Sequence, residues 1–130
     1  MVMRRRQFGR YWLLDELGSG GMAIVSRAMI EGPRGFTRTL VIKRIRPALS
    51  KDAWFINSLA TEARLSALLL HPAIVQVHDF GEVDGEYFIA MELVEGMDLL
   101  AVMRRAVHSQ VRLPVGVVAV QVWWTLHAAL

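Results

Sequence analysis

The stretch LGSGGMAIV, residues 17–25, most limits how this chain can fold, because three glycines fall within four residues between two apolar runs. Tyr11–Leu17 before the glycines and Ala23–Ile30 after them have the composition of β-strands. The pattern predicts a β-hairpin with a glycine-rich tip. Backbone in such a tip can approach a bulky anion closely, and its amides are suited to bind phosphate oxygens. A simple turn without a ligand is the alternative.

Further apolar runs continue the chain. They predict a strand, a helix, two strands and two helices at Arg38–Ile45, Lys51–Leu70, Val75–Phe80, Tyr87–Leu93, Asp98–Val107 and Pro114–Leu130. The first helix is the clearest, because apolar residues recur at helical spacing: Trp54, Phe55, Leu59, Ala63 and Ala67. Consecutive strands joined by short turns favour an α+β fold. We expect a five-stranded antiparallel sheet with one helix packed on it, followed by two helices.

The composition favours a cytoplasmic globular domain. Hydrophobic residues make up 54% of the 130 residues, and the absence of cysteine excludes disulfides and thiolate metal sites. The net charge is +3, but residues 1–46 hold ten basic and only three acidic side chains. We interpret residues 1–10 as a solvated basic extension, with nucleic-acid binding as the weaker alternative. No continuous apolar run follows it, which argues against a signal peptide.

Residues 113–130 carry no formal charge over 18 positions, about the minimum length of a membrane-spanning helix. Proline, glycine and polar residues interrupt the run at Pro114, Gly116, Gln121, Thr125 and His127. Because polar groups inside a bilayer are costly, a buried helix is the favoured interpretation and a membrane helix the alternative. A helix with uncovered apolar faces also predicts self-association or a protein partner.

Lys43 lies inside an apolar strand pattern, LVIKRI, where an unpaired charge is costly. Alternation along the strand places Val41 on the same face as Lys43. Lys43 therefore either reaches solvent from an edge strand or points into a cleft beside the glycine loop. In the second case its natural partner is Glu62, in the middle of the first predicted helix. The other choice for Glu62 is a surface pair with Arg64 or another basic residue.

The ordered set of motifs is more specific than its parts. The chain contains, in order, a glycine loop, Val25, VIK, Glu62, an HP dipeptide and MELVEGMDL. In this order it resembles the N-lobe of bacterial serine/threonine protein kinases of the eukaryotic-like (Hanks) type, from about Phe8 to Leu130. Three stretches carry the resemblance: FGRYWLLDELGSGGMAIV, EARLSALLLHPAIVQVHDFG and YFIAMELVEGMDL.

The resemblance implies a division of the chain. Residues 1–10 would be the basic extension, and residues 11–95 a kinase-like N-lobe whose one helix is called αC in that family. Residues 96–130 would be the hinge exit and the first helices of an incomplete C-lobe.

The resemblance also implies which residues hold ATP. Leu17 and Val25 resemble the roof of the adenine pocket. Lys43 resembles the lysine that binds the phosphates, and Glu62 its ion-pair partner, so these two would form the catalytic pair. The remaining positions implied for the nucleotide are Gly18, Ser19, Gly20, Gly21, Met22 and Ala23 in the loop, Val41 and the gatekeeper Met91 beside adenine, Glu92 and Val94 in the hinge, and Asp98 at the ribose.

Two departures lie inside these motifs. Ala23 stands where the family has its third loop glycine, and Val41 where it has the alanine of V-A-I-K. The valine adds volume beside adenine, and overfilling a tight site costs about 1–3 kcal/mol. We therefore expect ATP to bind weakly.

The catalytic-loop H-R-D and the metal-binding D-F-G motifs of the family are absent at their expected places. His78–Gly81 contains the letters DFG, but it lies too early in the chain and is expected to be a strand end and turn. We therefore expect no metal site and no phosphoryl transfer by this chain alone. The alternative function is a non-catalytic module that binds a kinase or another partner through 113–130.

Overall fold

A computed structural model describes residues 5–72 and 74–112. The chain divides into two compact units. The first comprises Met1–Leu70 and Val75–Leu93, and the second comprises His71–Ile74 and Val94–Leu130. Each unit is described by itself.

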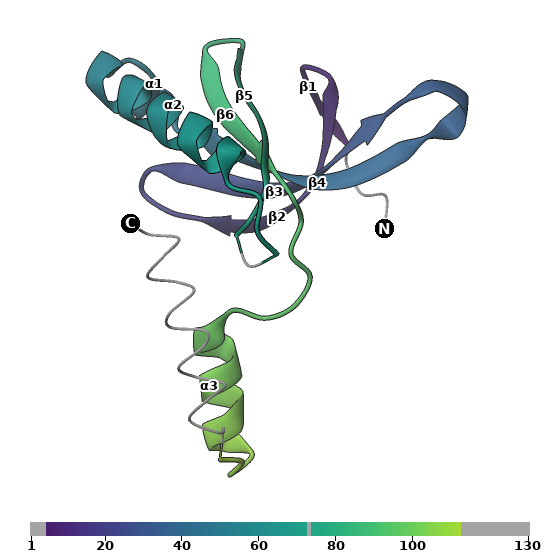
Figure 1. The fold of residues 1–130 in the computed structure, drawn as a ribbon, viewed down its shortest axis with the longest axis vertical. Helices are drawn as coiled ribbons and strands as arrows, with labels where there is room; N and C mark the ends of the chain where they lie inside the picture. The colour runs from purple at the N-terminus through teal and green to yellow at the C-terminus, as the bar shows by residue number, and fades with distance from the viewer. Residues whose placement is uncertain (1–4, 73, 113–130) are drawn as a thin grey trace. The chain divides into compact units, whose positions relative to one another are not determined.

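The first unit is built on a single antiparallel sheet of six strands in the order β1-β2-β3-β4-β6-β5. The strands are β1 (Arg6–Phe8), β2 (Tyr11–Ser19), β3 (Ala23–Glu31), β4 (Thr37–Ile45), β5 (Val77–Val83) and β6 (Glu86–Met91). Its helices are the short η1 (Pro33–Gly35) and α1 (Pro47–Ser50) and the longer α2 (Ala53–Leu68). The expected α+β fold, with an antiparallel sheet and one substantial helix packed on it, is confirmed (Figure 1).

The strand count differs from the five expected, because β1 adds a sixth strand within the stretch interpreted as an extension. β1 pairs with β2, with Phe8 opposite Tyr11. Phe8 is 3% exposed and meets Phe88 edge to face, with ring centroids 5.4 Å apart. β1 has only three residues and follows a run of arginines, so its sequence pattern is too short to recognise as a strand. Burial of Phe8 places β1 in the sheet.

Strand β4 separates two hydrophobic cores, because its residues alternate between the two faces of the sheet. Leu40 and Ile42 belong to a core formed with β1, β2, β3 and β6. Ile45, on the other face, packs with Ala23 and with Ile56 of α2. The helix therefore covers one end of one face, while the opposite face closes on itself as the sheet curls (Figure 1).

Helix α2 begins after Asp52, whose carboxylate accepts a hydrogen bond from the Phe55 amide at 3.1 Å. This N-cap satisfies one of the free amides of the first turn. Ile56 and Ala63 are buried against the sheet. Trp54, one of the apolar residues at helical spacing, is 78% exposed and does not pack on the sheet. Ala67, another member of that set, is also exposed, because the buried stripe runs through Ile56 and Ala63.

Arg44 shows how a charge is accommodated in the strand LVIKRI. Its side chain is 12% exposed and forms an ion pair with Glu86 at 3.3 Å. Its guanidinium also lies 5.8 Å from the centroid of the Phe8 ring. A nearby carboxylate and an aromatic face both compensate for lost hydration of the charge.

A hydrogen-bonded clasp fastens β5 to the start of β2, although these strands are not neighbours in the sheet. The Tyr11 hydroxyl donates to Asp79 at 2.9 Å and accepts from Arg10. Arg10 also donates to Asp79 at 2.9 Å. Burial, the largest cause, and Asp79 raise the pKa of Tyr11 against the opposing effect of Arg10, so the hydroxyl stays a donor. Asp79, the aspartate of the letters DFG, therefore holds the curled sheet together.

The letters DFG lie inside β5, which continues through Gly81 to Val83. The turn between the strands predicted at Val75–Phe80 and Tyr87–Leu93 consists of Asp84 and Gly85, which adopt positive φ angles of 51° and 81°. This tight turn joins β5 to β6.

In the second unit, helix α3 spans Leu99–His108, one residue from the prediction. No helix within 5–72 and 74–112 is long and apolar enough to cross a membrane. The helix expected at 114–130 lies outside the described residues.

His78 and Arg38 make a second tie, between β5 and β4. Arg38 Nη2 lies 2.8 Å from His78 Nε2. Partial burial, the largest cause, and then the charge of Arg38 lower the pKa of His78 below 6.5, while Glu92 opposes them. A neutral ring lets Nε2 accept the hydrogen bond from Arg38.

Replacing Tyr11 by phenylalanine tests the clasp. We expect Tyr11→Phe to lower the free energy of unfolding by about 1 kcal/mol, because Asp79 and Arg10 lose a shared partner in a partly buried place. Urea denaturation followed by circular dichroism measures the change. Tyr87→Phe is the matched control, because it removes a hydroxyl whose hydrogen bond to Glu82 is exposed to solvent. An equal loss in both variants would contradict the clasp.

Titration of His78 tests the second tie. Because the folded pKa lies below the unfolded value, the stabilising contribution of neutral His78 is present above about pH 6.5 and is lost as the pH falls through the folded pKa. NMR titration of the ring protons should give a pKa below 6.5 that rises, without full recovery, in Arg38→Gln. Arg34→Gln at the hairpin tip should not change it. A wild-type pKa of His78 at or above 6.5 would contradict the contact between neutral His78 and Arg38.

Candidate functional site

The register of the sheet brings together residues that are far apart in the sequence. Lys43 on β4 lies opposite Val25 on β3 and opposite Ile89 on β6. Residues directly opposite in antiparallel strands project from the same face. Val41 is two residues from Lys43, shares this face, and lies opposite Met91. We call these five residues the site face: Val25, Val41, Lys43, Ile89 and Met91.

The site face is apolar around a single charge. Val41 and Ile89 are buried, while Val25, Lys43 and Met91 are partly buried. Ile89 was not singled out from the sequence. The signal was available, because strand alternation from Met91 points to it, but only the register shows that it lies opposite Lys43.

The glycine-rich stretch is the tip of the hairpin of β2 and β3, as predicted. Gly18 pairs with Val25, which lies opposite Lys43, so one row crosses the sheet from the glycine loop to the lysine. Leu17 lies at a register irregularity between Glu16 and Gly18 and is 44% exposed. The loop itself is exposed through Met22, and Ala23 is buried beneath it at the start of β3.

The fold itself does not require the three loop glycines. A Cβ atom added at Gly18, Gly20 or Gly21 meets no atom within 4 Å. None of the three has a positive φ angle, in contrast to Gly85. A hairpin tip that served only as a turn would accept side chains at these positions.

Hydrogen bonds fix the shape of the loop. The Gly20 amide donates to the Ala23 carbonyl at 2.9 Å. Arg46, the residue after β4, donates from its amide to the Met22 carbonyl at 2.9 Å and from Nε to the Gly20 carbonyl at 2.8 Å. The loop is therefore attached to the end of the strand that carries Lys43.

The ion pair expected between Lys43 and Glu62 is not formed in this structure. Glu62 is exposed on α2, and no ion pair within 4.0 Å joins it to Lys43 among the described residues. The expectation that Glu62 faces the sheet is therefore not met. The neighbouring Ala63 takes the inward position, and successive helical residues differ by about 100° in direction.

The residues that follow β6 were expected to form the hinge. The Glu92 amide donates to the Gln76 carbonyl at 2.9 Å, and its carboxylate accepts from the Gln76 amide at 3.1 Å. The backbone group that Glu92 can offer to a ligand is therefore its carbonyl oxygen. Val94 and Asp98 belong to the second unit, where the Asp98 carboxylate caps α3 by accepting from Ala101 at 2.7 Å.

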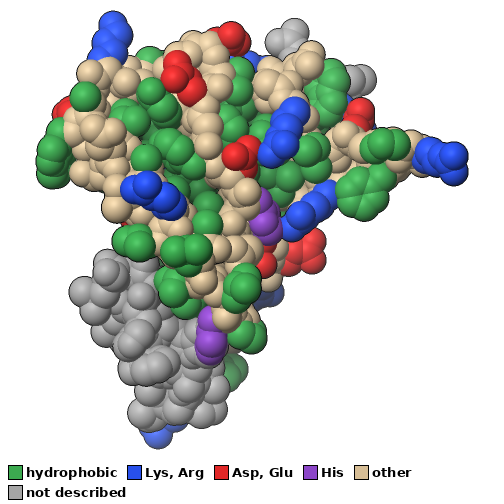
Figure 2. All heavy atoms as spheres, turned by 45° about the horizontal axis from the view of Figure 1, so that its top comes forward, with side chains coloured by type: hydrophobic (Ala, Val, Ile, Leu, Met, Phe, Trp, Pro, Cys, Tyr) green, Lys and Arg blue, Asp and Glu red, His purple; other side chains and the backbone are tan. Residues whose placement is uncertain are grey.

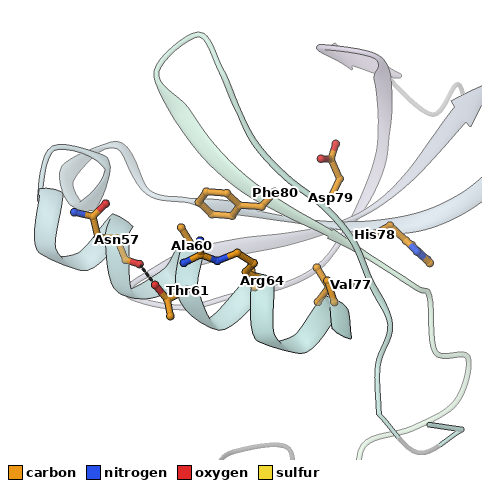
Figure 3. A pocket seen from close by; sticks show the side chains of 10 residues that line it. Asn57, Ala60, Thr61, Arg64, Val77, His78, Asp79 and Phe80 are labelled. Carbon is orange, nitrogen blue, oxygen red and sulfur yellow. Dashed lines mark hydrogen bonds between the residues drawn. The ribbon is translucent and has the colours of Figure 1, made fainter. Parts of the chain in front are cut away.

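A cavity of about 670 Å³ lies between α2 and β5. Figure 3 shows Phe80 pointing toward the helix and Asp79 pointing away from it, as alternation requires. Thr61, at the rim, donates to the Asn57 carbonyl at 2.9 Å. The residues that line this cavity come from α2 and β5. Phe80 pairs with Ile89, which lies opposite Lys43, so the cavity adjoins the site face.

The described part of the chain contains no group of three or more histidine, aspartate or glutamate residues placed to hold a metal ion.

No protein-family model matches the chain. The chain is 40% identical over 118 residues to the tyrosine-protein kinase MasK of Myxococcus xanthus. The alignment covers 91% of this chain and 18% of MasK. It is 41% identical over 98 residues to the serine/threonine-protein kinase PknH of Mycobacterium tuberculosis. That alignment covers 75% of this chain and 15% of PknH. It therefore spans less than a fifth of the length of these relatives.

Solved structures give the same similarity at the level of the fold. The kinase domain of PknI from Mycobacterium tuberculosis superimposes with a TM-score of 0.71 at 33% identity. The match covers 98% of this chain and 50% of that kinase-domain chain.

Alanine substitution tests whether the loop glycines serve the fold. We expect Gly21→Ala to leave the free energy of unfolding unchanged or to raise it by up to about 1 kcal/mol, because the position is open and its φ is not positive. Gly85→Ala is the control and should lower it by about 1–2 kcal/mol, because Gly85 has a φ of 81°. Urea denaturation measures both. An equal loss in the two variants would show that Gly21 is needed by the fold.

Proposed function

Because the chain belongs to the bacterial Hanks-type protein kinases and has the fold of their N-lobe, we propose that its site face and glycine loop bind ATP. In the intact family the γ-phosphate of ATP passes to a protein hydroxyl. The relatives include both a serine/threonine kinase and a tyrosine kinase, so they do not decide which hydroxyl is the acceptor. We propose serine and threonine as acceptors on the basis of the sequence resemblance alone.

The observation that carries the proposal is the row from Gly18 through Val25 to Lys43. The glycines at one end have no structural need to be glycine, so close approach of a ligand explains them best. The cation at the other end lies on an apolar face, where a phosphate would supply the missing negative charge. A phosphate chain that lies along this row would contact the backbone amides of the loop and also the Lys43 ammonium.

The apolar part of the site face suits adenine. Val41 and Met91 offer a hydrophobic surface beside the row from Gly18 to Lys43, and Val25 within the row extends it. The Glu92 carbonyl is the polar group available at its border. Val41 adds volume compared with the alanine usual in the family, and we infer from this that the affinity is low.

Lys43 is the residue of this chain that acts on the phosphates. Its ammonium is expected to neutralise charge on the phosphate oxygens and to fix their position. Glu62 would hold Lys43 only after it turns inward from its exposed place on α2. Magnesium, which accompanies ATP in kinases, neutralises phosphate charge, but the residues described here offer no cluster of ligands for it. The metal is therefore not assigned to this chain.

We further propose that these 130 residues do not transfer phosphate alone. The sequence contains no H-R-D motif, and Asp79 of the letters DFG is engaged by Arg10 and Tyr11. The general base and the metal ligands of phosphoryl transfer are thus lacking. Nucleotide binding without turnover is the expected behaviour.

A second candidate function is a non-catalytic module that binds a protein partner. The observation in its favour is a group of exposed leucines at and after the end of α2: Leu65, Leu68, Leu69 and Leu70. Figure 2 shows hydrophobic side chains at the surface between charged ones on one face of the molecule. The segment 113–130, expected to bind such a partner, lies outside the described residues. A stable complex of fixed stoichiometry would favour this function, and polydisperse aggregates would count against it.

Calorimetry with Mg-ATP tests the proposed function. We expect measurable binding that Lys43→Ala weakens at least tenfold, because a charge-assisted contact to phosphate contributes about 1.5–3 kcal/mol. Lys51→Ala is the matched control, since the chain has only these two lysines and Lys51 is exposed before α2. Its affinity should equal that of the wild type.

Two results would contradict the proposal. Equal weakening by both lysine substitutions would remove Lys43 from the site. Phosphate transfer to a protein substrate by the purified 130-residue chain would refute the claim that it lacks turnover.

A further inference from the structure

Arg46 makes two hydrogen bonds to the glycine loop, and no motif had drawn attention to it. Its amide donates to the Met22 carbonyl at 2.9 Å, which extends the pairing of β3 and β4 by one residue. Its Nε donates to the Gly20 carbonyl at 2.8 Å. One residue thus holds two carbonyl groups that are separated by a single residue.

These contacts determine which way the loop amides point. The peptide bond is planar and trans, so its C=O and N–H groups point in opposite directions. When the Gly20 carbonyl points at Arg46, the Gly21 N–H points away from it. The Gly21 amide donates no backbone hydrogen bond among the residues that the structure describes, so it remains available to a ligand.

The backbone of Arg46 is itself held in place. Pro47 follows it and restricts it to the extended conformation that it adopts, with φ −61° and ψ 140°. Its carbonyl accepts hydrogen bonds from Leu49 at 2.9 Å and Ser50 at 3.2 Å in the first turn of α1. The side chain therefore extends toward the loop from a fixed point, three residues after Lys43.

We propose that Arg46 is a positioning residue for nucleotide phosphates. It holds the peptide between Gly20 and Gly21 so that the Gly21 amide faces the phosphate chain, and it ties the loop to the strand that carries Lys43. This inference rests on the proposed function, because it assigns to Arg46 a role in the same site. The ligand chemistry is that of a di- or triphosphate attached to adenosine.

The first measurement needs no nucleotide. Hydrogen exchange of backbone amides, followed by NMR, reports local opening of the loop. Arg46→Met keeps most of the side-chain volume but removes the donor, and should speed exchange at Gly20 about tenfold. Arg38→Met is the matched control on β4, the strand that Arg46 follows, because the Arg38 guanidinium bonds to His78 and not to the loop. It should leave exchange in the loop unchanged.

The second measurement separates positioning from a structural role. Calorimetry with ATP and with adenosine compares ligands with and without phosphates. Arg46→Met should weaken ATP about fivefold and leave adenosine unchanged, because only the phosphates contact the loop amides. Arg46→Lys should recover part of the ATP affinity, and Arg38→Met should match the wild type with both ligands.

Each outcome decides the proposal. Unchanged exchange in Arg46→Met would overturn it whatever the nucleotide result. Equal weakening of ATP and adenosine would show a structural role only and would also overturn it. If the folded wild-type chain bound no ATP, the proposed function would be overturned instead. This outcome differs from a specific effect of Arg46, because the Arg38→Met control would also fail to bind ATP.

Discussion

The pairing of β4 with β3 on one side and β6 on the other is the constraint on which the rest of the structure depends. A central strand must satisfy both faces, and its alternation sends Leu40 and Ile42 into one core and Ile45 into the other. A shift of one residue would exchange the two faces and bury Lys43 in the first core. The hydrophobic pattern therefore fixes both the register and the face on which the lysine stands.

The same alternation separates the two neighbouring charges of LVIKRI. Arg44 is directed to the core that contains Phe8, where Glu86 and the aromatic ring compensate its charge. Lys43 stands on the opposite face beside the glycine hairpin and has no acidic partner within 4.0 Å among the described side chains. Arg44 thus supports the fold, and we propose that Lys43 binds a ligand.

Much of this arrangement could be predicted from the sequence because it rests on local patterns. The glycine hairpin, the strand around Lys43 and the helix after Asp52 all have short-range signals. The curl of the sheet does not, since it depends on contacts such as Phe8 with Phe88, 80 residues apart in the chain. β1 was missed for the same reason.

The orientation of α2 was the other limit. Trp54 was among the apolar residues at helical spacing, and the resemblance placed Glu62 beside Lys43, but burial of Ile56 and Ala63 turns both outward. Side chains of neighbouring strands decide which stripe of a helix is buried, and they are not read from the helix alone. The bonds from Arg46 to the loop likewise join residues 26 apart and have no local pattern.

Amide chemical-shift mapping tests the central claim most directly, because it reports on every part of the sheet at once. ATP titrated into the ¹⁵N-labelled chain should perturb the amides of the glycine loop, of Val41–Lys43 and of Met91–Glu92. The face that carries Phe8 and Phe88 should remain unperturbed. Perturbations confined to the cavity between α2 and β5, or absent from the glycine loop and Lys43, would contradict a nucleotide site at the glycine loop and Lys43.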